Sequence, residues 1–306
     1  MKTPVAIFFY RRPEMVAGLL EILRGPQPKR VWLIADGPQE ESPAERALCY
    51  KARQVAEESI RWPCEVRRVY AETNLGLKQR FESGLDVLFM EESEAIILEE
   101  DCHPESDFFP FCVEMLDRYR EEPRVGGISG NCFLPRRHAL ETDYFFSRYL
   151  HIWGWATWAR AWHSYNRTRW NWPVRGYREY FPGTTRQEEK YWNRIFARVS
   201  SGHFSTWDYP WASWFWRQRW VSITPAENLV RNVGFGPEAT NTRDLGVKMG
   251  IERENRLQAP YQGPTKIQAD PSLDRAIFEN HFLRTEGKLG FWPRLIRSIG
   301  KRMARA

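Results

Sequence analysis

Residues 1–130 alternate short apolar runs with longer amphipathic stretches, and this alternation constrains the fold more than any other feature of the chain. Continuous apolar runs of this length are typical of strands that are covered on both faces. The runs that we expect to form strands are Val5–Tyr10, Val31–Ala35, Cys64–Tyr70, Ala95–Leu98 and Val125–Ser129. Helical patterns lie between them, so the sequence predicts an α/β fold with a mainly parallel sheet flanked by helices.

Two local signals locate helix starts in this region. Ser42 and Glu45 form a capping box, with Pro43 at the first helical position. Asn74-Leu-Gly76 predicts a turn before a helix whose apolar residues recur at three-to-four spacing. Further helices are expected from Pro13 and from about residue 106.

The second half of the chain has a different composition. Twelve of the fifteen tryptophans lie between Trp153 and Trp220, and helices are predicted at 187–200 and 210–219. The pattern weakens after Ile223. No linker separates the two halves, so we expect one composite domain over residues 1–245, divided near residue 130, and a loosely packed extension over 246–306.

Composition and charge disfavour several classes of protein. No apolar run approaches the roughly 18 residues of a membrane span, and Arg11 and Arg12 follow the first apolar run, where a signal peptide would have none. The five cysteines contain no Cys-x-x-Cys pair, which indicates reduced thiols in a cytoplasmic protein. Seven basic residues between Arg284 and Arg305 exceed the net charge of +6, so the main body is nearly neutral and we do not expect nucleic-acid binding.

Polar side chains follow three of the expected strands. Arg12 comes after the first, Asp36 after the second, and Glu99-Glu100-Asp101 directly after the fourth. Ligands of open α/β sheets bind at the carboxyl ends of strands. Three consecutive carboxylates repel one another, and a divalent cation would compensate them. The alternative is a solvated acidic loop. No glycine-rich dinucleotide or phosphate-binding loop is present.

Asp208 is a further candidate for chemistry. Trp207, Tyr209 and Trp211 surround it in the sequence. Such neighbours desolvate a carboxylate and raise its pKa towards values useful for proton abstraction. The alternative is an aspartate that caps the helix beginning near Pro210.

These segments together resemble a known family. The strand followed by Glu99-Glu100-Asp101 and then by Asp107-Phe-Phe109 is similar to a segment of GT-A glycosyltransferases. The order of the other motifs resembles the bacterial glycosyltransferase-2-like, haemolytic-protein-like group and, more distantly, the alpha-mannosyl-glycoprotein N-acetylglucosaminyltransferases. The further motifs are Pro4-Val5, Arg11-Arg12-Pro13, Ile34-Ala-Asp-Gly-Pro38, Asn74-Leu-Gly76, Trp153-Gly-Trp155, Trp207-Asp-Tyr-Pro-Trp211 and Arg231-Asn-Val-Gly-Phe-Gly236, with Thr242 after them.

The resemblance implies a GT-A fold and a metal-dependent, inverting transfer of a hexosyl or N-acetylhexosaminyl group from a nucleotide sugar, with a UDP-sugar favoured. Arg12 and Asp36 would hold the base and ribose, Glu99 and Glu100 the ribose and sugar, and Asp101 the Mn²⁺ or Mg²⁺. Asp208 would be the general base. The acceptor would be a glycan, a lipid-linked glycan or a protein, in polysaccharide biosynthesis for example.

The sequence departs from the family at two positions. Glu100 stands where aspartate is expected, and Asn241 stands where the relatives often have histidine. The first departure shifts a carboxylate by about one methylene group. The second puts an additional metal or phosphate contact in doubt.

The tryptophans have two interpretations. Aromatic faces stack on sugar rings, so Trp153, Trp155, Trp207 and Trp211, which lie next to motifs, are candidate acceptor contacts. For most of the others, core packing is the better interpretation. A non-catalytic carbohydrate-binding protein would also explain the aromatic cluster, but it would not explain the acids at strand ends.

The C-terminal residues 291–306 form a basic amphipathic pattern. Apolar residues such as Trp292 and Leu295 fall on one helical face and cations such as Arg294 and Arg297 on another. A helix of this kind can lie on an anionic membrane surface, which would make the protein peripheral on the inner membrane face. The alternative is a helix that docks on the catalytic domain.

Overall fold

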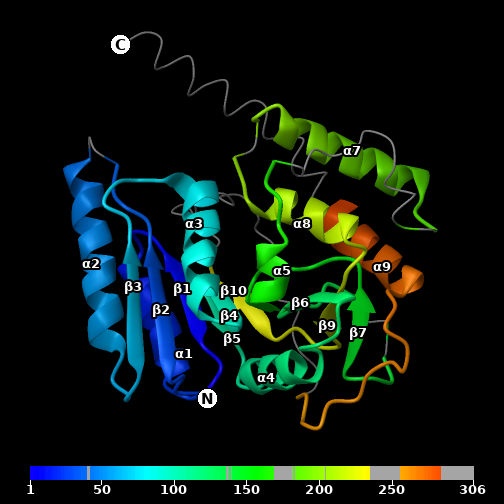
Figure 1. The fold of residues 1–306 in the computed structure, drawn as a ribbon, viewed down its shortest axis with the longest axis horizontal. Coiled ribbons are helices and arrows are strands. Elements are labelled where there is room, and N and C mark those ends of the chain that lie inside the picture. Colours follow the sequence, from blue (N-terminus) through cyan, green and yellow to red (C-terminus); the bar gives the residue numbers. More distant parts are fainter. Residues whose placement is uncertain are drawn as a thin grey trace.

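The computed structural model describes residues 1–39, 42–135, 138, 140–168, 181, 183–203, 205–234 and 256–283. Within these ranges eight strands form one sheet in the order β3-β2-β1-β4-β8-β6-β9-β7, with helices on both of its faces (Figure 1). The first four strands are β1 (Val5–Phe9), β2 (Arg30–Ala35), β3 (Glu65–Tyr70) and β4 (Glu94–Glu99). They are mutually parallel, as the alternation of strand and helix patterns predicts.

The second part of the sheet is mixed. Its strands are β6 (Val125–Ser129), β7 (Tyr144–Ser147), β8 (Trp155–Trp158) and β9 (Val221–Pro225). β8 lies between β4 and β6 and is antiparallel to both, whereas β9 is parallel to β6 and antiparallel to β7. The sequence analysis did not predict β7, β8 or β9, because runs of four or five residues are too short for their pattern to distinguish a strand from a buried helical turn.

The sheet separates two hydrophobic cores. Side chains alternate along each strand, so Val5, Ile7 and Phe9 of β1 enter one core while Ala6 and Phe8 enter the other. The first core is covered by α1 (Pro13–Leu23), α2 (Pro43–Ser59) and α4 (Phe108–Arg118). The second is covered by α3 (Gly76–Glu91), α5 (Ala159–His163), α7 (Arg186–Ser200) and α8 (Asp208–Arg217).

The segment 256–283 packs into both cores. Tyr261 belongs to the first core, and Ile277 and Phe278 belong to the second. These last two residues lie at the junction of α9 (Pro271–Ile277) and the π-helix η1 (Phe278–Leu283). The expectation of a loosely packed extension is therefore wrong for 256–283, since a few apolar residues without regular spacing are enough to anchor it. Asn241 and the basic pattern of 291–306 lie outside the described residues.

Two expectations from composition can be compared with the structure. All five cysteines are described; none is in a disulfide, and four are buried. Among the helices of the described ranges, none is both long and apolar enough to cross a membrane.

Candidate functional site

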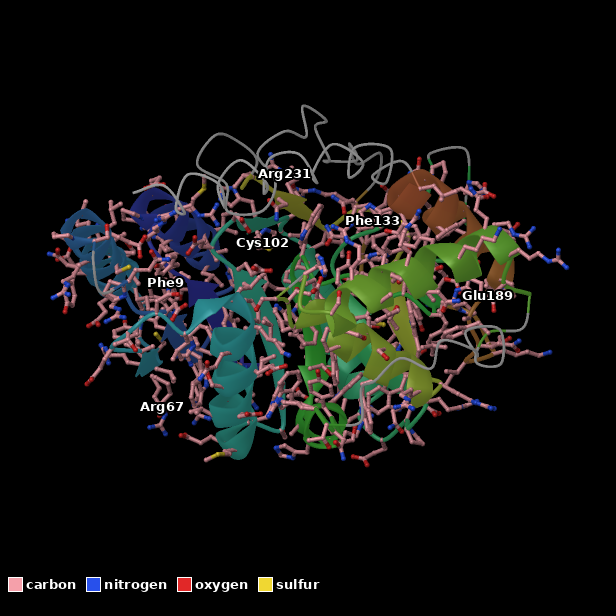
Figure 2. The ribbon with its side chains drawn as sticks, turned by 90° about the horizontal axis from the view of Figure 1, so that it is seen from above. Phe9, Arg67, Cys102, Phe133, Glu189 and Arg231 are labelled. Atoms are coloured by element: carbon pink, nitrogen blue, oxygen red, sulfur yellow. The ribbon has the colours of Figure 1, made fainter. Side chains whose placement is uncertain are left out.

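The polar residues that follow β2, β1 and β4 meet at one edge of the sheet. These three strands are neighbours and are parallel, so Asp36, Arg12 and the acidic triplet of Glu99, Glu100 and Asp101 lie at adjacent strand ends. β5 (Cys102–Pro104) begins directly after the acids and pairs with β10 (Val230–Asn232). Figure 2 marks this region by Cys102 on β5 and Arg231 on β10. The sequence analysis predicted this convergence of the three strand ends.

Arg12 binds two of the three acids. Its Nε donates to Glu100 Oε1 at 2.5 Å, and its Nη2 donates to Asp101 Oδ2 at 2.9 Å. The backbone N–H of Tyr10 donates to the other oxygen of Glu100 at 2.6 Å. Burial raises the pKa of Glu100, and the Arg12 cation opposes that rise. Glu100 and Arg12 therefore form a partly buried ion pair that fixes the end of β1 against the end of β4.

The turn after β10 closes over Asp101. Asn232 Nδ2 donates to Asp101 Oδ1 at 3.3 Å, and the N–H of Val233 donates to the carbonyl of Asp101 at 2.9 Å. A Cβ atom on Gly234 would lie 2.1 Å from Asp101 Oδ2, so only glycine permits this close approach of the backbone. The Asn232–Gly234 part of the motif identified in the sequence is thus placed against the acid that the family resemblance assigns to the metal.

Asp36 organises a loop. Its Oδ1 accepts the N–H groups of Gly37 and Leu75, each at 2.8 Å, and its Oδ2 accepts the N–H of Gly76 at 3.0 Å and the Asn74 amide at 3.2 Å. Gly76 has a φ of +76°, which favours glycine. The Asp-Gly and Asn-Leu-Gly motifs are therefore two halves of one structure, and Asp36 fixes where α3 begins.

Arg80 is a functional candidate that the sequence analysis did not identify. It lies on the second turn of α3 and is 6% exposed, and its Nε is buried without a hydrogen-bond partner among the described residues. Burial lowers its pKa, and the nearby charge of Asp36 opposes this. A buried cation without a partner is costly unless a ligand supplies the anion. The available signal was a charged residue at the same helical face as Gly84 and Leu88, which are both buried.

Asp208 approaches the acidic triplet from the other half of the chain. It is the first residue of α8, accepts a hydrogen bond from the Thr206 hydroxyl, and the N-cap residue Trp207 makes no side-chain cap. Burial raises the pKa of Asp208. Burial also raises the pKa of Glu99 well above its usual value, and Asp101 and Asp208 add to that rise. Glu99, Asp101 and Asp208 thus interact electrostatically, although Asp208 lies far from the other two in sequence.

A cleft of about 250 Å³ lies beside Asp208, and two of the four candidate tryptophans reach it. Trp153 and Trp211 are among its lining residues. Trp155 and Trp207 are buried to 1% and 2% exposure, and their rings stack with centroids 5.7 Å apart. This burial places Trp155 and Trp207 in core packing. Of the ten described tryptophans between 153 and 220, the two that keep partial exposure are Trp153 and Trp214.

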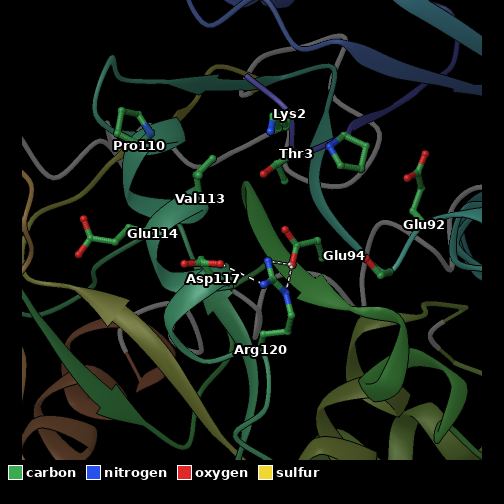
Figure 3. A pocket seen from close by; sticks show the side chains of 11 residues that line it. Lys2, Thr3, Glu92, Glu94, Pro110, Val113, Glu114, Asp117 and Arg120 are labelled. Atoms are coloured by element: carbon green, nitrogen blue, oxygen red, sulfur yellow. Dashed lines mark hydrogen bonds and ion pairs between the residues drawn. The ribbon is translucent and has the colours of Figure 1, made fainter.

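A larger hollow of about 630 Å³ lies at the opposite ends of β1 and β4, next to Thr3 and Glu94 (Figure 3). Arg120 there pairs with Glu94 at 3.3 Å and with Asp117 at 3.0 Å. The hollow faces the amino ends of the strands, whereas sheets of this type bind their ligands at the carboxyl ends, so it is a weaker candidate site.

The described residues contain no cluster of three His, Cys, Asp or Glu side chains arranged as a complete metal site. A hard divalent cation such as Mg²⁺ does not require one, because it usually binds one or two carboxylates and takes its other ligands from water and substrate phosphates. Asp101 is the acid that could supply such a ligand. Its two oxygens accept from Arg12 and Asn232 in this structure, so a cation would have to replace at least one of these contacts. A nucleotide diphosphate would also add negative charge to this group of acids, which a cation would offset.

Comparisons with known proteins give little further information. No protein-family model matches the sequence, and no curated protein is significantly similar to it. Among solved structures, apo UDP-glucose pyrophosphorylase is 8% identical over 74% of this chain and 93% of that chain, with a TM-score of 0.34. UDP-glucose pyrophosphorylase in complex with UDP-glucose is 10% identical over 54% of this chain and 71% of that chain, with a TM-score of 0.26. Both scores are low, so neither similarity identifies a family or an activity for this chain.

Proposed function

We propose that the protein is a metal-dependent, inverting glycosyltransferase that moves a sugar from a nucleotide-sugar donor to a hydroxyl group of a glycan, a lipid-linked glycan or a protein. The observation that carries the proposal is that Asp208, which lines a cleft, is near enough to Glu99 at the carboxyl end of β4 for its charge, with that of Asp101, to raise the pKa of Glu99. The family resemblance of the motifs assigns the same residues to the same activity.

The nucleotide would occupy the region between Asp36 and the acidic triplet. Arg80 supplies a buried cation for an anionic or carbonyl group of the ligand, and Asp36 holds the loop and helix that position Arg80. Arg12 keeps Glu100 and Asp101 in place. Asp101 would hold the metal ion, which would neutralise the diphosphate leaving group.

The acceptor would enter from the cleft. Its hydroxyl oxygen attacks the anomeric carbon of the donor, the bond from that carbon to the diphosphate breaks, and the hydroxyl proton passes to the Asp208 carboxylate. The raised pKa of Asp208 makes its carboxylate a stronger base than that of an exposed aspartate. Single displacement on the face opposite the leaving group inverts the anomeric configuration.

A thermal-shift panel of UDP-, GDP-, CMP- and dTDP-sugars, each with and without Mn²⁺ or Mg²⁺, tests the proposal. We expect a shift with one nucleotide class, UDP first, that needs the metal; a ligand at 100 times its Kd adds about 2.7 kcal/mol of stability. Asp101→Asn should remove the metal-dependent part, whereas Asp117→Asn, an exposed aspartate on α4, should not. Equal nucleotide binding by Asp101→Asn, or binding that ignores the metal, contradicts the metal assignment.

A further inference from the structure

The cleft beside Asp208 has a distinctive lining. Asp208 is the one Asp, Glu, Lys or Arg among the described residues that line it, and aromatic rings make up much of the rest. Phe133 stacks on His281 with centroids 3.8 Å apart and packs edge-on against Trp153 at 5.6 Å. The cleft has a volume of about 250 Å³, which is below the roughly 300–1,000 Å³ of sites for drug-sized ligands. This volume favours a ligand that consists of a single small ring.

Three lining residues carry buried polar atoms that lack a hydrogen-bond partner among the described residues. They are Asn131 Oδ1, His151 Nε2 and Trp211 Nε1, in side chains that are 1%, 6% and 1% exposed. Such atoms are rare in folded proteins, and three of them belong to residues around one cleft. Each atom is covered by its neighbours, so a ligand in the cleft would reach it after a small rotation of the side chain. Asn131 Oδ1 is an acceptor, Trp211 Nε1 is a donor, and His151 Nε2 can be either. Hydroxyl groups can both donate and accept hydrogen bonds, so they could pair with all three atoms.

The charged groups around the cleft disfavour an anionic ligand. Burial lowers the pKa of His151 well below its usual value and lowers the pKa of His281 to about 4, so both rings are neutral at pH 7. A phosphate or carboxylate group placed here would meet Asp208 and no cation of the lining residues. A purely apolar ligand would leave the three polar atoms unpaired.

We propose that this cleft binds one uncharged pyranose ring of the acceptor, with His151 and Trp211 hydrogen-bonding its hydroxyl groups and the partly exposed Trp153 against its apolar C–H face. This inference rests on the proposed function, since it places the sugar ring beside Asp208, the base that would take the proton from one of its hydroxyl groups. It adds His151 and Asn131 to the acceptor site and gives the segment that carries His281 a part in forming it.

The test uses saturation-transfer NMR with the full chain and three methyl hexopyranosides, of gluco, galacto and manno configuration, with and without UDP and Mn²⁺. The methyl glycoside of glucuronic acid is the anionic probe of the same ring. The variants are His151→Phe, which keeps an aromatic ring but removes both ring nitrogens, and Trp211→Phe, which removes the indole N–H. His163→Phe, an exposed histidine on α5, is the matched control. Melting temperatures show that each variant is folded.

We expect the wild type and His163→Phe to bind at least one neutral glycoside, and the folded cleft variants to bind it at least tenfold more weakly, which corresponds to about 1.4 kcal/mol. The glucuronide should bind at least tenfold more weakly than the glucoside. The inference is wrong if UDP binds but no neutral glycoside does, if the folded cleft variants bind as the wild type does, or if the glucuronide binds equally well. Glycoside binding without any nucleotide binding would support the cleft and contradict the proposed glycosyltransferase.

Discussion

Asp208 is the residue on which the proposed chemistry depends most directly. Replacing it by asparagine keeps the size and the hydrogen bond from Thr206 but removes the proton acceptor. We expect kcat to fall about 10²- to 10⁴-fold, because that is the usual contribution of a positioned general base, with little change in donor affinity. Since burial raises the pKa of Asp208, the wild-type rate should decline as the pH falls through that raised value, and the variant should lack this limb.

Steady-state kinetics and calorimetric titration of the donor measure the two effects separately. Asp117→Asn is the control, because Asp117 is an exposed aspartate that pairs with Arg120 away from the site. Near-normal turnover by Asp208→Asn would show that Asp208 is not the general base and has only a structural part at the start of α8. A product that retains the donor's anomeric configuration would contradict single displacement.

Arg80 gives a second prediction at the residue scale. The substitution Arg80→Met keeps a long, unbranched side chain and removes the buried charge. Because the buried Nε of Arg80 has no hydrogen-bond partner among the described residues, the melting temperature without ligand should stay the same or rise, while nucleotide affinity should fall at least about tenfold. Arg24→Met, on an exposed arginine that directly follows α1 and pairs with Glu21, should change neither quantity. A less stable Arg80→Met protein with unchanged nucleotide affinity would show that Arg80 is structural.

The site residues differ in how far the sequence could identify them. Arg12, Asp36 and the acidic triplet follow strands, and the end of a strand is visible as the end of an apolar run. Arg80 was missed because a single arginine in a helix normally points into water, and its spacing of four residues from Gly84 is too weak a signal to show that it faces the sheet. The interaction of Asp208 with Glu99 depends on how the two halves pack, which no local pattern specifies.

At the scale of elements, α3 lies unusually close to the sheet at Gly84. A Cβ atom there would lie 2.7 Å from side-chain atoms of Phe8 and Ile34, which belong to the buried faces of β1 and β2. Gly84→Ala should therefore destabilise the protein by about 1–3 kcal/mol, the usual cost of overpacking, despite the better helix propensity of alanine. Urea unfolding followed by circular dichroism measures the change.

Gly18 of α1 is the matched control for this substitution. A Cβ atom on Gly18 meets nothing closer than His103 Nε2 at 3.4 Å, an ordinary contact. Gly18→Ala should stabilise the protein by about 0.5–1 kcal/mol through helix propensity alone. If the two variants shifted the unfolding midpoint equally, the close packing of α3 on β1 and β2 would be wrong.

At the scale of the whole molecule, the predictability of the fold changes near residue 130. The first four strands and their helices were predicted because each strand is continuous in apolar residues and each helix has a start signal, so the order of elements determines the parallel sheet. Beyond that point β8 inserts between β4 and β6, although β6 precedes it in the chain. That arrangement follows from the packing of aromatic side chains in the second core and not from any local spacing.

A buried polar network joins distant parts of this second half. Arg148, which follows β7, binds Glu188 of α7 and lies 3.5 Å from Asp274 of α9, and Ser147 Oγ donates to Asp274 at 2.5 Å. One guanidinium thus serves two buried carboxylates. Burial raises the pKa of Asp274 to about 7, and the attraction of Arg148 only partly opposes this.

The raised pKa of Asp274 predicts how the free energy of unfolding depends on pH. Between about pH 4 and pH 7 the folded protein holds this proton and the unfolded chain does not, so stability falls as the pH rises through this range, by up to about 1.4 kcal/mol per pH unit from this group. Asp274→Asn cannot lose the proton. Urea unfolding at several pH values measures the unfolding free energy of both proteins. From about pH 4 to pH 7 the wild type should lose stability relative to Asp274→Asn, and above pH 7 the difference between the two should become constant. A difference that stays constant over this range, or that moves in favour of the wild type, would mean that Asp274 is already ionised in the folded protein and that Arg148 stabilises both carboxylates.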